Sequence, residues 1–154
     1  MNTKEKLTIT EFYLEVPIEY KDFVSQAHEL LTAHGYKSKI LLKRHGLSAQ
    51  YNSPNTKGNT LQFVIKENVL SMYLYNVFMY EFNGYLEKLP TIVIQEYDEY
   101  RNCNDSCNPV CSAPMRFHYS INEKQYRKCV SGRQLFIVDE EIVTGILSVL
   151  RKTI

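Results

Sequence analysis

Four cysteines are the residues of this sequence whose type and spacing point most directly to chemistry. Cys103, Cys107, Cys111 and Cys129 follow the pattern C-x3-C-x3-C-x17-C. Four thiolates complete the tetrahedral coordination shell of Zn²⁺, which favours soft sulfur ligands. The segment that holds the first three is rich in Asn, Asp, Ser and Pro, so it has few apolar side chains for a core of its own. Because metal binding and folding are coupled, we predict a structural zinc site with these four ligands.

The spacing of the cysteines leaves other interpretations open. Common zinc knuckles use C-x2-C or C-x4-C pairs, and bacterial ferredoxins use C-x2-C-x2-C, so the x3 spacing matches neither. The thiols could instead be free and buried as small hydrophobic side chains, or form disulfides or a redox-active pair. An iron–sulfur cluster or a catalytic role is the remaining alternative. His118 could replace one sulfur, although its alternation with Phe117 and Tyr119 predicts an ordinary strand residue.

The cysteine segment resembles an uncharacterised family of small bacterial proteins. The matching residues are Cys107-Asn108-Pro109-Val110-Cys111, Phe117-His118-Tyr119-Ser120-Ile121 and Tyr126-Arg127-Lys128-Cys129. In that family a C-N-P-x-C loop precedes a Y-x-I hairpin that ends in K-C, and a last helix follows. The resemblance covers residues 103–154 and implies a bacterial, cytosolic protein, and it assigns no activity.

Apolar side chains at three- and four-residue spacing predict a helix over residues 18–34, and Gly35 follows it as a C-cap. We expect the polar residues 1–10 to form a loose tail or a short edge strand. Residues 36–77 then alternate with a period of two, which indicates four strands, the last over residues 69–77. The turns between them are short, so the strands are expected to form an antiparallel meander.

Helical spacing returns over residues 79–102, where Pro90 divides the segment into two helices. After the cysteines, residues 116–121 and 124–129 predict a hairpin, and Leu135 to Val138 predict a further strand. Asp139 is expected to cap a last helix. This order predicts a single α+β domain over residues 1–154, with helices on one face of an antiparallel sheet and a cysteine-rich loop and hairpin at 103–129.

The formal net charge of +1 results from the cancellation of basic and acidic segments. Residues 36–66 contain six basic and no acidic side chains, whereas residues 67–115 contain two basic and seven acidic ones. An anion or a nucleic acid could bind the basic strands, where Tyr73 and Tyr75 share a face and could stack on bases. The candidate anion-binding residues are Lys39, Lys43, Arg44 and His45, joined by Arg127, Lys128 and Arg133 if both groups of strands form one sheet.

These charges and rings also have a simpler interpretation. Lysines on edge strands prevent pairing with the edges of other sheets, and exposed charge needs no further cause. Tyrosines are amphipathic, so the tyrosine pair fits a covered sheet face as well as a stacking surface.

The sequence contains no phosphate-binding loop, dinucleotide glycine motif, nucleophile elbow or H-E-x-x-H zinc motif. We expect His28 and His34 to be surface or capping residues of the first helix. No nucleophile, base and orienting group can be named together, so no enzymatic activity is predicted. The first residues lack the apolar core of a signal peptide, and no apolar run reaches the length of a membrane span. These features favour a cytoplasmic protein that does not contact a membrane.

We therefore expect a binding or interaction module that a zinc ion stabilises, with a protein or a small ligand as its partner. One alternative is a thiol-based redox or regulatory protein that uses the same cysteines. The other is a nucleic-acid-binding module that uses the basic strands.

Overall fold

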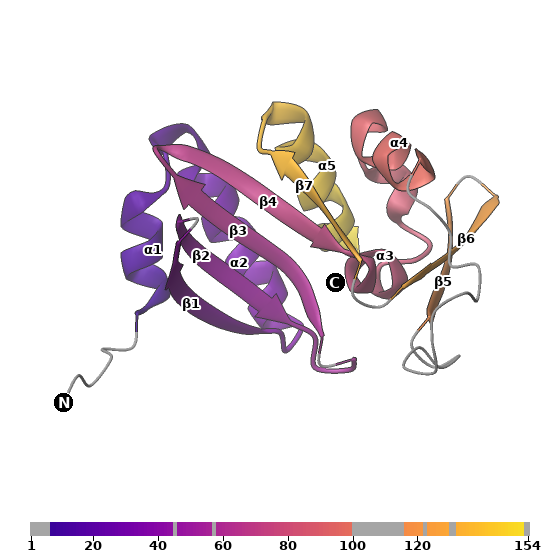
Figure 1. Cartoon of the computed structure of the whole chain (residues 1–154), viewed down its shortest axis with the longest axis horizontal. Coiled ribbons are helices and arrows are strands. Elements are labelled where there is room, and N and C mark those ends of the chain that lie inside the picture. The colour runs from indigo at the N-terminus through magenta and orange to yellow at the C-terminus, as the bar shows by residue number, and fades with distance from the viewer. Residues whose placement is uncertain are drawn as a thin grey trace.

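A computed structural model describes residues 7–44, 46–56, 58–99, 116–121, 123–129 and 132–152. It confirms the α+β class: helices lie behind one face of a twisted antiparallel sheet, and a separate two-stranded hairpin stands beside them (Figure 1). None of the helices in these ranges combines the length and the apolar character needed to cross a lipid bilayer.

The first helical region consists of α1 (Ile9–Glu15), the 3₁₀ turn η1 (Ile18–Tyr20) and α2 (Lys21–Ala33). The expectation of a tail or strand over residues 1–10 is wrong at its end, because Thr8 caps α1. The Thr8 hydroxyl oxygen accepts a hydrogen bond from the Glu11 backbone N–H at 3.4 Å, and Thr8-x-x-Glu11 is the spacing of a capping box. Gly35 ends α2 as predicted, with a φ of 88° that its missing Cβ permits.

Four consecutive strands form the meander, with bounds β1 (Lys37–Lys43), β2 (Gly46–Asn52), β3 (Asn59–Lys66) and β4 (Val69–Tyr75). Glu67 and Asn68 both have positive φ, as a two-residue hairpin turn between β3 and β4 requires. The predicted fourth strand is two residues too long, because the chain becomes helical at Asn76. Its sequence there, Asn-Val-Phe-Met, has only Asn76 as a residue that disfavours strands, and no Gly or Pro to mark the change.

The fifth strand of the sheet comes from much later in the chain. The strand β7 (Arg133–Ile137) pairs with β4, which gives the order β1-β2-β3-β4-β7. It leads into α5 (Glu140–Lys152), whose N-terminus is capped as predicted: the Asp139 carboxylate accepts a hydrogen bond from the Ile142 N–H at 2.9 Å. Strands β1 and β7 are therefore the two edges of the sheet.

Between β4 and β7 the chain forms α3 (Asn76–Glu81), η2 (Leu86–Lys88), α4 (Thr91–Glu99) and the predicted hairpin of β5 (Arg116–Ile121) with β6 (Lys124–Cys129). The hairpin is a sheet of its own and does not extend the meander. It is attached to the helical layer where the Ser120 N–H donates to the Asn83 side-chain oxygen at 3.0 Å.

The period of two assigns opposite chemistry to the two faces of the large sheet. One row across its strands is entirely buried and packs against the helices: Ile40, Ala49, Phe63, Met72 and Phe136. The neighbouring row faces away from them: Lys39, Gln50, Gln62, Tyr73 and Leu135. Helices from both ends of the chain thus share one core on a single face.

Gly145 provides a test of this core, because it lies inside α5 rather than in a turn or cap. A Cβ at this position would lie 2.4 Å from Pro90 Cδ and 3.1 Å from the Lys88 carbonyl oxygen. Ala usually stabilises a helix relative to Gly, but here overpacking dominates. We expect Gly145→Ala to lower the free energy of unfolding by about 1–3 kcal/mol, measured by urea denaturation. The exposed neighbour Thr144→Ala should raise it slightly, and a stabilised Gly145→Ala variant would contradict this packing.

Candidate functional site

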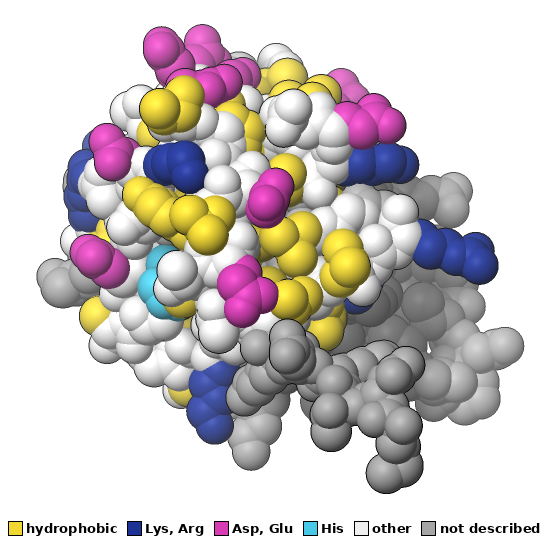
Figure 2. All heavy atoms as spheres, turned by 90° about the vertical axis from the view of Figure 1, so that its left-hand side faces the viewer, with side chains coloured by type: hydrophobic (Ala, Val, Ile, Leu, Met, Phe, Trp, Pro, Cys, Tyr) yellow, Lys and Arg dark blue, Asp and Glu magenta, His cyan; other side chains and the backbone are white. Residues whose placement is uncertain are grey.

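A groove of about 1100 Å³ lies beside the edge strand β1. Its walls are β1 on one side and the start of α1 with the middle of α2 on the other. Apolar side chains form most of it, namely Leu7, Ile9, Ile40 and Leu42. In the view onto this side of the molecule, hydrophobic side chains gather at the centre and charged ones surround them (Figure 2).

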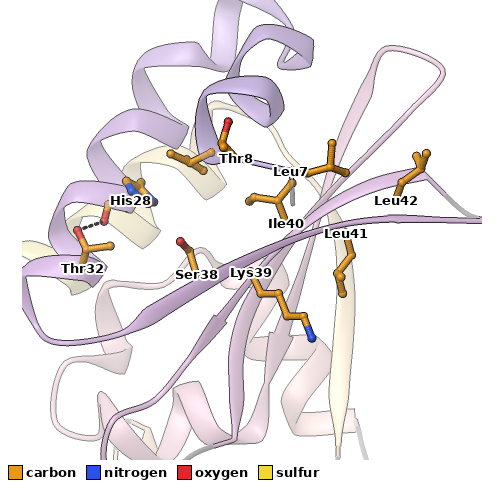
Figure 3. A pocket seen from close by; sticks show the side chains of 10 residues that line it. Leu7, Thr8, His28, Thr32, Ser38, Lys39, Ile40, Leu41 and Leu42 are labelled. Carbon is orange, nitrogen blue, oxygen red and sulfur yellow. Dashed lines mark hydrogen bonds between the residues drawn. The ribbon is translucent and has the colours of Figure 1, made fainter. Parts of the chain in front are cut away.

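The alternation of β1 positions the side chains of the groove. Figure 3 shows Ser38 and Ile40 directed toward the helices, whereas Lys39 and Leu41 point to the other side of the strand. Ile40 is almost completely buried, but Leu42 at the far end of the groove is 75% exposed. An exposed Leu at the end of an apolar groove leaves hydrophobic surface that a ligand could bury.

The backbone of β1 adds a second feature to the groove. β1 pairs with β2 only, so its outer edge has no strand partner in the described part of the sheet. In an antiparallel pair, every second residue directs its N–H and C=O away from the partner strand. A row of backbone donors and acceptors therefore lies along the apolar groove.

His28 lies at the helical wall with two other polar residues, Thr8 and Thr32. Its Nδ1 lies 2.8 Å from the hydroxyl oxygen of Tyr51, which is fully buried in the core. Burial lowers the pKa of His28 from its ordinary value of 6.5, and the weaker field of Glu29 acts in the opposite direction. Burial also raises the pKa of Tyr51. Both groups are therefore neutral at pH 7, and the bond between them is one between neutral partners.

His28 also lines a second hollow of about 260 Å³ between α1 and α2, together with Tyr13 and Val24. It is thus shared by two neighbouring hollows. The sequence predicts that His28 is a surface or capping residue. The structure adds that it is half-buried and contacts the core residue Tyr51, which lies on a strand that the helical pattern alone cannot locate.

The predicted anion-binding residues divide into two groups. Lys39 and Lys43 lie on β1, with Arg44 in the following turn, and all three are exposed. Arg127 and Lys128 lie on β6, which belongs to the separate hairpin. The condition that both groups of strands form one sheet is therefore not met.

Arg133 does reach the large sheet, but at the opposite edge from β1. Its guanidinium carbon lies 4.1 Å from the ring centroid of Tyr73. Its Nη1 donates a hydrogen bond to the Tyr75 hydroxyl oxygen at 3.2 Å. The Tyr75 hydroxyl donates in turn to Gln62 Oε1 at 2.8 Å. Tyr73 and Tyr75 share a sheet face as predicted, but Arg133 occupies them, so they do not present free stacking surfaces.

Three of the predicted zinc ligands, Cys103, Cys107 and Cys111, lie outside the described residues. Cys129 is the last residue of β6 and is paired with Arg116, the first residue of β5. Among the described residues, no group of three or more His, Cys, Asp or Glu side chains is arranged to hold a metal.

Comparison with known proteins gives no relative for this chain. Neither protein-family models, nor curated proteins, nor solved structures match it. The groove along β1 is therefore assigned as the candidate site on its geometry alone.

The lowered pKa of His28 predicts how pH acts on stability. The unfolded chain takes up a proton at this residue near pH 6.5, above the pKa of the folded state. The stabilising contribution is therefore complete above pH 6.5 and is lost as the pH falls toward the folded pKa. Urea denaturation at pH 7.5 and 5.5 should show a loss of stability on acidification that is smaller in His28→Gln. The control His34→Gln should keep the full loss, and equal losses in all three proteins would contradict the burial of His28.

Proposed function

We propose that this protein is a protein-interaction module that binds an extended segment of a partner along the free edge of β1. One observation supports this function above the others: β1, which has no second strand partner among the described residues, lies directly beside a large apolar groove. Each feature alone is common. Together they match the requirements of strand addition, in which the backbone supplies affinity and adjoining pockets supply specificity.

The dimensions of β1 fit an added strand. β1 has seven residues, which is enough for a row of backbone hydrogen bonds with a partner segment of similar length. Alternate side chains of that segment would point to the helical side, where Ile40 and Leu42 offer apolar contact. The other side chains of the segment would point to the opposite side of the sheet, beside Lys39 and Leu41.

The groove fits an extended chain better than a small molecule. Its volume of about 1100 Å³ lies above the usual range for small-molecule pockets. It also follows β1 from Ser38 to Leu42 instead of closing around one point. A long open groove leaves much of a small ligand exposed to water. A peptide strand would both cover the apolar groove and form hydrogen bonds with the backbone edge of β1.

The exposed side chain of Leu42 gives the sharpest test of the groove. Peptides selected from a random display library on the wild-type protein should lose at least about tenfold in affinity for Leu42→Asp, because a charge replaces the apolar contact. The matched control is Ile137→Asp on the other edge strand, where Ile137 is 69% exposed. This control should bind the same peptides with unchanged affinity in fluorescence anisotropy.

Two outcomes would overturn the proposed function. One is the absence of any enriched peptide from a library that covers extended sequences. The other is a set of peptides that bind Leu42→Asp and the wild type equally. A set that responds only to Ile137→Asp would move the binding edge to β7 and also contradict the proposal.

Zinc binding is a second proposed property, and one feature of the backbone supports it. The register Arg116↔Cys129 brings the end of β6 beside the start of β5. Cys111 precedes Arg116 by five residues, so the cysteine segment enters the hairpin at the end that holds Cys129. Four thiolates shared between this segment and the hairpin end would suit tetrahedral Zn²⁺. The zinc would act as a structural ion that orders the segment.

Metal analysis tests this property. Protein purified from zinc-supplemented medium should contain one zinc per chain, and Cys129→Ser should weaken zinc retention during dialysis against a chelator. Leu42→Asp serves as a folded control with all four thiols. A metal-free protein with fewer than four free thiols would exclude the zinc site and favour the redox alternative.

A further inference from the structure

We propose that the partner segment alternates apolar and acidic side chains, with the acidic ones on the side of the sheet that faces away from the helices. This inference rests on the proposed function and specifies its partner. It implies the pattern acidic–apolar–any–apolar–acidic for the five residues opposite Lys39 to Lys43.

The charge of β1 is confined to one of its two sides. Lys37, Lys39 and Lys43 are exposed and lie at alternating positions, so they share the side of the strand that faces away from the helices, where Lys39 also borders the groove. Lys39 and Lys43 are about 13 Å apart along the strand. Their neighbours on β2 in the same rows are Gln50 and Gly46, which are uncharged. The positive potential on this side of the edge is therefore not neutralised within the hairpin.

The helical side of the groove has the opposite character. Glu11 accepts a hydrogen bond from Thr8, which lines the groove, and Glu29 acts electrostatically on His28 at the helical wall. An acidic side chain directed into the groove would meet apolar surface, with the negative charges of Glu11 and Glu29 beside the Thr8 and His28 side chains of its helical wall. The same side chain on the other side of the strand would meet the lysines. The groove therefore distinguishes the two sides of an incoming strand by charge.

This arrangement also argues against two other occupants. A second copy of the chain paired edge to edge through β1 would bring the lysines of both copies together, and like charges on adjacent strands are destabilising. A single-stranded nucleic acid needs free aromatic rings beside its phosphate contacts, but Tyr73 and Tyr75 are occupied by Arg133. A strand of alternating apolar and acidic side chains would form hydrogen bonds with the backbone edge, cover the apolar groove and pair its carboxylates with the lysines.

Three synthetic peptides separate the role of charge from that of the groove. The acidic probe is Glu-Val-Glu-Val-Ser-Val-Glu, and its matched controls replace every Glu with Gln or with Lys. Isothermal titration at low salt should give an affinity for the acidic peptide on the order of tenfold above that for the Gln peptide, as expected for a few exposed ion pairs. The difference should disappear near 1 M salt, because exposed pairs are then screened.

Charge reversal on the protein completes the test. The double variant Lys39→Glu/Lys43→Glu should prefer the Lys peptide, whereas Lys88→Glu/Arg151→Glu, with the same change in net charge outside the groove, should keep the original preference. Circular dichroism should confirm that both variants fold, since all four side chains are exposed.

The outcomes distinguish this inference from the proposed function. Equal binding of the acidic and Gln peptides, both weakened by Leu42→Asp, would overturn the charge pattern and leave the groove intact. Failure of every peptide to bind, by titration and in the display selection, would overturn both. Displacement of the acidic peptide from the wild type by a single-stranded DNA of equal charge, at equal concentration, would show a general anion site and overturn the acidic strand.

Discussion

The pairing of β7 with β4 determines which surface of this protein stays open. Phe136 lies beside Met72 in the buried row, and Arg133 covers Tyr73 on the other face. Backbone bonds extend the pairing beyond both strand ends, from Asn76 to Gly132 and from Val138 to Leu70. The fifth strand is therefore added next to β4, and within the described ranges the outer edge of β1 has no strand partner beside the groove.

Charge explains why the last strand joins β4 rather than β1. β1 contains three lysines within seven residues, and β7 begins with Arg133. Pairing β7 with β1 would bring like charges close together, whereas pairing with β4 places the guanidinium over an aromatic ring, a favourable contact. The same lysines thus disfavour a basic strand at this edge and give the edge its positive charge.

Local signals in the sequence were sufficient for much of the fold. The period of two over the meander, the positive φ at Gly35 and the cap at Asp139 follow from the chemistry of neighbouring residues. The same kind of signal was present for α1, where Thr8 and Glu11 have capping-box spacing, but the polar composition around them concealed it. Helix boundaries such as Asn76 depend on packing that a local pattern does not contain.

The candidate site depended on information of another kind. The identity of β1 as an edge follows from the partner of β7, which lies far away in the chain. The neutral state of His28 follows from its contact with Tyr51 in a different element. The groove volume follows from how α1 and α2 sit against β1. The sequence identified the basic residues of β1, but only the fold separates them from Arg127 and Lys128 and sets them beside an apolar groove.

The distance in sequence between β4 and β7 also has a consequence for how the protein is made. Tyr75 and its partner Arg133 are 58 residues apart, so the meander leaves the ribosome well before the strand and helix that complete it. Until then, the row of Ile40, Phe63 and Met72 is covered only by helices from the earlier part of the chain. Such non-local pairing slows folding, and partly covered apolar sheets are prone to aggregate. During synthesis the edge of β4 is therefore open until β7 pairs with it and becomes the outer strand in its place.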